Sequence, residues 1–251
     1  MALFIFIVFH WYLSLFFQSF FHHRYSAHGQ FSMTRGWEKF FYWCCFITQG
    51  SSYISAYSYG IMHRLHHMHT DTGSDPHSPD NYSGFFSLML NTRNNYFAIY
   101  SGKTPVDKKM TKDLPQWVAF DKIAHHPLSR LFWVCVYVLI YLWLATSWWM
   151  FLFLPFTIIM GTLQGAVVNY WAHRLGYVNF KTGDQSKNIV PLDLFFWGEG
   201  YHNNHHKNPG RAKNAYRWFE FDFGYLVLRI FNAFNIIRLK KNPPFIKYTA
   251  S

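Results

Sequence analysis

Residues 1–21 contain no Asp, Glu, Lys or Arg. Two further uncharged apolar runs, 131–145 and 148–168, follow each other later in the chain with only Thr146 and Ser147 between them. A membrane-spanning helix needs about 20 mostly apolar residues, and lipid leaves a chain no outside partner for its backbone polar groups. These runs therefore predict an all-α integral membrane protein with several membrane segments.

Charge is sparse and unevenly distributed. Only 14% of the residues are charged, against about 25% in a typical soluble domain, yet the formal net charge is +11. Lys and Arg gather in 103–130 and 207–247, beside the apolar runs. This distribution is typical of cytoplasmic flanks that face anionic lipid, and we expect no nucleic-acid partner. An acidic substrate headgroup or an acidic redox partner would also suit it.

Two histidine triplets share one spacing. The segments His63–His67 and His202–His206 both read His-x-x-His-His, with histidines at i, i+3 and i+4. On an α-helix these positions lie within about 100° of one another. Three imidazoles on one side of a helix are hard to explain by packing alone, so the triplets predict ligand-binding positions.

Two other segments offer further candidates. His23 and His28 are five residues apart, about 140° on an α-helix, so they should not share one face. We expect one in the last turn of a helix and the other just beyond it. Asn169 and His173, four residues apart, do share a face. Asn169 could bind a metal through a water molecule or hydrogen-bond to a neighbouring helix.

The candidates together suggest a metal centre. Neutral imidazole suits Zn, Cu, Fe and Ni, whereas Ca and Mg prefer oxygen ligands. Nine nitrogens are too many for one ion and fit two ions, with a position left for oxygen or water. A site beside the membrane implies a hydrophobic substrate, and iron is the metal that would activate O2 against it. The nine candidate histidines are His23, His28, His63, His66, His67, His173, His202, His205 and His206.

A shared site constrains the topology. If His23 and His28 join His63, both ends of the segment 38–60 lie on one side of the membrane, and that segment must be re-entrant. The hairpin of 131–145 and 148–168 then returns the chain to the same side. We expect a single domain over 1–251 with its site on the cytosolic face, under a cap formed by 61–130 and 173–251.

The histidine segments resemble those of a known family. The chain is similar to the membrane fatty acid desaturases, in particular their acyl-CoA/acyl-lipid Δ9, stearoyl-type branch. The resemblance covers nearly the whole chain in order and spacing. The segments that carry it are HRYSAH (23–28), HRLHH (63–67), DPHS (75–78), NYWAH (169–173), GEGYHNNHH (198–206) and YRW (216–218).

This resemblance implies a diiron enzyme that uses O2 and two external electrons to desaturate a fatty acyl chain bound to CoA, a carrier protein or a lipid. A ferredoxin or cytochrome b5 type donor with its reductase would supply the electrons. The nine histidines would bind iron, with Asn169 acting through water, and no other catalytic residue is implied. Asp71, Asp75 and Glu199 would orient imidazoles, while His69 and His77 match non-ligand positions.

One departure and several alternatives remain. The family usually has two membrane hairpins, but only about 20 residues precede the first histidine segment, which is room for one crossing. Arg64 and Arg174 follow ligand positions and would meet carboxylates, a substrate headgroup or solvent. A diiron fatty acid or carotenoid hydroxylase or ketolase is the nearest alternative function. A membrane metal-binding or transport protein is an alternative of another class.

Overall fold

A helical rod begins the chain. The computed structural model describes residues 1–241, and in it α1 (Ala2–Phe17) runs directly into η1 (Gln18–Ala27), a π-helix. The rod is 26 residues long and apolar enough to cross a membrane. His28 ends it, and the backbone N–H of His28 donates to the carbonyl oxygen of His23 at 3.1 Å.

A helical hairpin follows the rod. It comprises α2 (Arg35–Gln49), a single 3-10 turn η2 (Gly50–Ser52) and α3 (Ala56–His69). The side chains of Thr34 and Ser55 cap α2 and α3, because each hydroxyl accepts a backbone N–H of the first turn. Polar residues of this segment therefore end one helix and begin the next.

The second apolar region is bent. α7 (Pro127–Leu144) is long enough to span a membrane, and only 11% of this apolar helix is buried inside the protein. The run that follows forms η4 (Trp148–Phe153), α8 (Leu154–Ile158) and α9 (Met160–Trp171). α9 departs from the direction of the η4–α8 helix by 70°, so the second arm of the expected hairpin, 148–168, is bent.

The η2 turn and the bend complete each other's hydrogen bonds. The Ser51 hydroxyl donates to the carbonyl oxygen of Ile158 at 2.6 Å, and the Ser52 hydroxyl accepts the backbone N–H of Gly161 at 2.9 Å. Arg130, near the start of α7, donates to the carbonyl oxygens of Ser51 and Tyr53. Broken helix is tolerated at membrane depth where protein supplies such partners.

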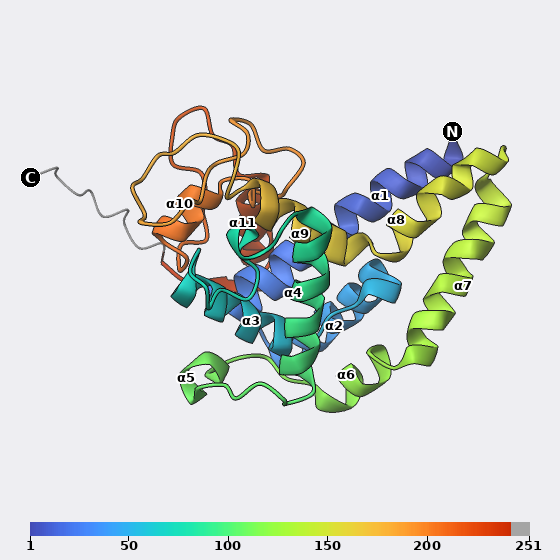
Figure 1. Cartoon of the computed structure of the whole chain (residues 1–251), viewed down its shortest axis with the longest axis horizontal. Helices are drawn as coiled ribbons and strands as arrows, with labels where there is room; N and C mark the ends of the chain where they lie inside the picture. The colour runs from blue at the N-terminus through green and yellow to red at the C-terminus, as the bar shows by residue number, and fades with distance from the viewer. Residues whose placement is uncertain (242–251) are drawn as a thin grey trace, which may run out of the picture.

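Six further helices complete the described part of the chain, and one of them, α10, carries the second histidine triplet. They are η3 (Pro79–Asn81), α4 (Phe85–Tyr100), α5 (Lys108–Thr111), α6 (Val118–Ala124), α10 (His202–Lys207) and α11 (Phe223–Ala233). A short antiparallel pair, β1 (Phe31–Ser32) with β2 (Arg238–Leu239), aligns Phe31 with Leu239. Figure 1 shows α1, α7 and α8 at one end of the molecule and α10 at the other.

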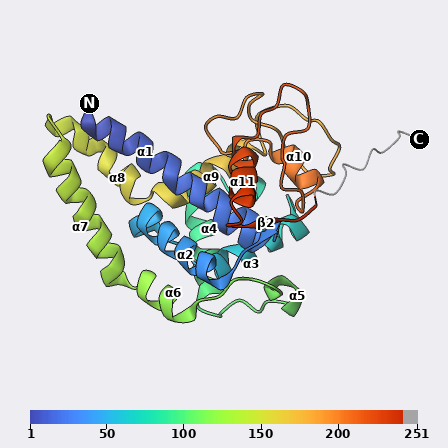
Figure 2. The same ribbon diagram turned by 180° about the vertical axis from the view of Figure 1, so that it is seen from behind.

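Aromatic packing joins the rod to the hairpin and to α11. The Phe20 ring lies 4.6 Å from that of Phe41 on α2 and 5.4 Å from that of Phe231 on α11, measured between centroids. Figure 2 shows α11 beside the end of the rod opposite the N-terminus. Buried aromatic side chains contribute strongly to packing energies, so this cluster holds η1 against α2 and α11.

The predicted fold class is confirmed. Helices make up 61% of the structure and strands 3%. Two helices of the described residues have spanning length, or three if the bent pair crosses as one unit. Exposed apolar side chains along α7, such as Leu139 and Leu142, suit contact with lipid. The last part of the predicted cap, residues 242–251, lies outside the described residues.

Gly50→Ala should destabilise the hairpin. Gly50 has φ +52°, and a Cβ there would meet the Tyr137 hydroxyl on α7. Backbone strain of this kind costs about 1–3 kcal/mol, so we expect a lower midpoint in thermal unfolding of the detergent-solubilised protein. Gly73→Ala is the control, because a Cβ at Gly73 meets nothing within 4 Å. Equal midpoints for the two variants would contradict the expectation.

Candidate metal centre

Five histidines form a closed ring of nitrogens. Each Nε2 atom lies 2.9–3.1 Å from the next, and the last returns to the first. η1 and its cap supply two of the rings, α3 supplies two and α10 supplies one. The members of this five-histidine group are His23, His28, His63, His67 and His205.

Four histidines form a second set beside the first. The Nε2 atoms of His66 and His206 lie 3.3 Å apart, and those of His173 and His202 lie 3.1 Å apart. All four offer nitrogens within 4.8 Å of one another, and we call them the four-histidine group. Each triplet is therefore divided between the two groups. α3 contributes His66 to the four-histidine group, and α10 contributes His202 and His206.

The π-helix explains how His23 and His28 come together. On an α-helix they would point about 140° apart, and we expected them not to share a face. In η1 the turns are widened to i→i+5 hydrogen bonds, and the Nε2 atoms of the two residues lie only 3.1 Å apart. The expectation of one ligand in the last turn and one just beyond it describes their positions, but the expected divergence was wrong.

Burial keeps the imidazoles neutral. Burial, together with the neighbouring imidazoles, lowers the pKa of His28, His63, His202 and His205 well below 6.5. The same holds for His66, His67 and His206. Neutral imidazole is the form that binds metals, and the protonated nitrogen determines which nitrogen is left to bind.

Acidic side chains contact Nδ1 in four of the histidines. Such a contact keeps the proton on Nδ1 and leaves Nε2 as the nitrogen that can bind a metal. Glu199 lies 2.6 Å from Nδ1 of His23, and Asp75 lies 2.8 Å from Nδ1 of His66. Asp71 lies 3.0 Å from Nδ1 of His173. Burial alone would raise the pKa of Asp71, but its contact with His173 lowers it to about 2. The three acids expected from the sequence therefore contact ligand-type histidines and leave each Nε2 lone pair facing its group.

A fourth acid, Asp184, was not expected. It lies 3.0 Å from Nδ1 of His206 and is held by the Thr182 hydroxyl and the backbone N–H of Ser186. Asp184 belongs to the irregular chain between α9 and α10, far from any histidine segment. The sequence carries no local signal for its role beyond a turn-forming Thr-Gly-Asp pattern.

The nitrogen spacing fits metal ions. Metal–nitrogen bonds of about 2.1 Å that meet at right angles place neighbouring nitrogens about 3.0 Å apart. The ring of the five-histidine group has this spacing throughout. Neutral imidazoles whose lone pairs converge at this distance repel one another unless a cation lies among them. The donor set, nitrogen only, suits iron, copper, nickel or zinc.

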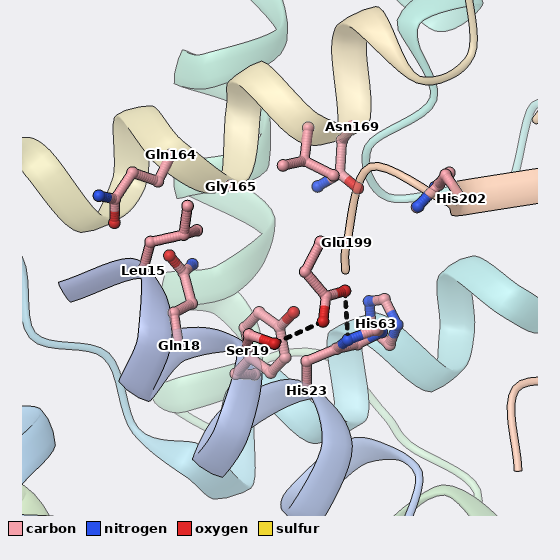
Figure 3. Close-up of a pocket in the computed structure, with 12 residues that line it drawn as sticks. Leu15, Gln18, Ser19, His23, His63, Gln164, Gly165, Asn169, Glu199 and His202 are labelled. Carbon is pink, nitrogen blue, oxygen red and sulfur yellow. Dashed lines mark hydrogen bonds and ion pairs between the residues drawn. The ribbon is translucent and has the colours of Figure 1, made fainter. Parts of the chain in front are cut away.

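Asn169 lies beside both groups without closing either. Its amide points into a pocket of about 40 Å³ that His63, Glu199 and His202 also line. Figure 3 shows this pocket between α9 and the rod, with Glu199 bonded to His23 below the Asn169 amide. This placement suits a contact with a metal-bound water and does not require a direct bond.

A larger apolar cavity adjoins the histidines. It has a volume of about 450 Å³ and shares His63 and Asn169 with the small pocket. Its walls come from α3, α4, α8 and α9, and include Met62, Leu88, Phe97, Ile158 and Ala166. Cavities of about 300–1,000 Å³ with few polar groups are typical small-molecule sites.

His77, Arg64 and Arg174 lie outside the two groups. His77 is buried 4.2 Å from His66, ring to ring, and lines the cavity. It forms a third ligand-like set with His66 and Asp75, but that set reuses a histidine of the four-histidine group. Arg64 donates to backbone carbonyl oxygens, including that of Ala27. Arg174 donates to the carbonyl oxygen of Pro79.

A helical membrane protein with two buried histidine groups beside an apolar cavity is the class that the fold and the site define. A family model described as fatty acid desaturase matches residues 1–222. The chain therefore belongs to the fatty acid desaturase family, as its histidine segments predicted, and this family consists of oxidoreductases of lipid metabolism.

Known proteins resemble the chain over most of its length. It is 28% identical to Delta-9 desaturase-like 5 protein of Arabidopsis thaliana, over 90% of this chain and 72% of the relative. It is 27% identical to Delta-9 acyl-lipid desaturase 1 of the same plant, over 88% and 70%. The sn-1 stearoyl-lipid 9-desaturase of Synechocystis sp. is 26% identical, over 88% of this chain and 66% of the relative.

Asp184→Asn should weaken metal binding at the four-histidine group. Losing a partner that orients a ligand imidazole typically costs 10- to 100-fold in metal affinity. Titration of the metal-free protein with Fe2+ under anaerobic conditions should show one of two equivalents weakened by this factor. Asp107→Asn is the matched control, since Asp107 is exposed and bonds only within α5 and its cap. An unchanged titration for Asp184→Asn would contradict the role of Asp184.

Proposed function

We propose that this chain desaturates a long-chain fatty acyl substrate in an O2-dependent reaction at a diiron centre. The reaction converts –CH2–CH2– to –CH=CH– and reduces O2 to two waters, consuming two electrons and two protons from outside. The names of the relatives support carbon 9 as the site of the double bond. The single observation that carries the proposal is the position of the two histidine groups at the edge of the apolar cavity.

The histidines would bind the metals. The five-histidine group and the four-histidine group would bind one iron ion each, and Asn169 would contact the second through water. Two bound iron ions supply O2 activation and hydrogen removal. The chain's own contribution is to aim nine Nε2 atoms, exclude water and position the acyl chain.

The cavity supports a chain-like, apolar substrate. An unactivated methylene carries no polar handle, so only the shape of the cavity can select which carbons face the metals. His63 and Asn169 border both the cavity and the small pocket, so an acyl chain in the cavity would lie against the histidine groups. The buried walls would also keep bulk water away from the reacting carbons.

The topology follows from the same site. We propose that the histidine groups lie on the cytosolic face, that 38–60 is a re-entrant hairpin and that 61–130 and the described residues from 173 onward cap the single domain. The bonds that Ser51 and Ser52 make to the bend at Ile158–Gly161 support a segment buried in protein. An acidic ferredoxin or cytochrome b5 type donor would supply the electrons.

Expression in a host of defined lipid composition should yield a fatty acid with a new double bond at carbon 9. Mapping of the double bond by mass spectrometry checks the position. His66→Ala and His205→Ala, one from each group, should abolish the product and lose iron while the protein still inserts into the membrane. Metal analysis of the purified variants checks the second part.

Products also separate the alternatives. Exclusively hydroxylated or keto products would overturn desaturation in favour of a hydroxylase or ketolase. One zinc per chain with no O2-dependent product would favour a metal-binding protein. Near-normal turnover in His66→Ala or His205→Ala would contradict the diiron centre.

Ala166→Phe should change chain-length preference. Ala166 is buried on α9 and lines the cavity, so a phenyl ring there would shorten or block the space for the acyl chain. We expect loss of product from the longest substrates, with iron content unchanged, in an assay of a chain-length series. Ala233→Phe, at an exposed position of α11, is the control. An unaltered chain-length profile would contradict the cavity as the acyl site.

A further inference from the structure

The four acids that orient ligand histidines are themselves held in two ways. Asp75 accepts backbone N–H groups of Asp71 and His77, at 3.0 Å each. Asp71 accepts the backbone N–H of Gln185, and Asp184 accepts the hydroxyl of Thr182. Within residues 1–241, none of these three acids forms an ion pair with Lys or Arg. Only Glu199 differs.

Glu199 is held by a buried arginine. The Arg24 Nε donates to Glu199 and to the Ser19 hydroxyl, at 3.3 Å each, while that hydroxyl donates to Glu199 at 2.6 Å. Arg24 is only 1% exposed and Glu199 7%. The arginine and the serine hydroxyl therefore hold the carboxylate in place beside His23.

Arg24 also bonds chain segments that precede and follow Glu199 in the sequence. Its two terminal nitrogens donate to the carbonyl oxygens of Ala212 and Trp197, at 2.6 and 3.0 Å, and to Asp222 at 3.3 Å. At Gly198, next to Glu199, a Cβ would meet both Asp222 and Arg24, and the backbone has φ +88°. The forked guanidinium is the side chain that can serve several acceptors in fixed directions at once.

Of the two acids that Arg24 contacts, Glu199 is the one bonded to a candidate ligand histidine. Glu199 bonds His23, a member of the five-histidine group, and no member of the four-histidine group. The acids of the four-histidine group have their own backbone and hydroxyl donors. Loss of Arg24 would thus release Glu199 and the His23 ring, while the histidines paired with Asp71, Asp75 and Asp184 would keep their orientation.

We propose that Arg24 is a positioning residue for the metal ion of the five-histidine group, acting through Glu199 on His23. This inference rests on the proposed diiron function. It makes the two metal positions separately adjustable. One depends on a buried ion pair, and the other on three acids bonded by backbone N–H and hydroxyl groups.

Chelator-driven release of Fe2+ from the iron-loaded, detergent-solubilised protein tests the proposal. In the unaltered protein two equivalents should leave slowly. In Arg24→Gln one equivalent should leave 10- to 100-fold faster, the range for a lost partner of a ligand histidine, and the other should leave at its original rate. Arg24→Lys, which restores the charge without the fork, should recover part of the difference.

Double variants separate positioning from a general loss of structure. Arg24→Gln combined with Glu199→Gln should release iron no faster than the faster of the two single variants, because both act on His23. Arg24→Gln combined with Asp184→Asn should accelerate both equivalents. Arg229→Gln is the control for losing an arginine, since Arg229 is exposed on α11 and belongs to neither histidine group. It should accelerate neither equivalent selectively.

Two results would overturn the inference. Either both equivalents leave equally fast from Arg24→Gln, or neither is accelerated, while the unaltered protein holds two iron ions and forms product. An unaltered protein that takes up no iron would instead overturn the proposed function, and the role of Arg24 with it. Thermal unfolding of each variant shows whether faster release merely follows a lower midpoint, which would also contradict the proposal.

Discussion

Convergent lone pairs on neutral imidazoles are the constraint on which this structure depends. Five Nε2 atoms about 3 Å apart repel one another in the absence of a cation, so the surrounding protein must hold them in place. Glu199 holds the far side of the His23 ring in this group, and Asp75, Asp71 and Asp184 hold three rings of the four-histidine group in the same way. Aromatic packing of Phe20 against Phe41 holds η1 against α2. The fold is largely a frame that brings η1, α3, α9 and α10 to one place.

Much of this centre could be predicted from spacing. The i, i+3, i+4 triplets indicate ligand positions because an α-helix turns by a fixed angle, and all nine candidate histidines fall in the two groups. The division of each triplet between the groups depends on the rotation of α3 and α10, which the sequence does not specify. Asp184 could not be found, because only the folded loop brings it to His206.

The bend between α8 and α9 marks another limit of the sequence. An uninterrupted apolar run over 148–168 reads as one helix, and hydropathy does not register which backbone groups find partners elsewhere. Ser51 and Ser52, about a hundred residues earlier, supply those partners. Two polar residues of the segment expected to be re-entrant are thus the ones that allow the later helix to break, and the break helps to form the cavity wall.

The wide turns of η1 change the direction in which successive side chains point around the axis of the rod that α1 begins. Ile5, Val8 and Phe9 on α1 are exposed, whereas nearly every residue of η1 is buried. Each i→i+5 turn shifts the residues after it relative to the 3.6-residue repeat. The direction of His23 and His28 relative to the outward stripe of α1 therefore differs from the one that a 3.6-residue repeat would give. Substitutions of these exposed side chains that adapt α1 to a different bilayer can therefore accumulate without disturbing the contacts of the two imidazoles.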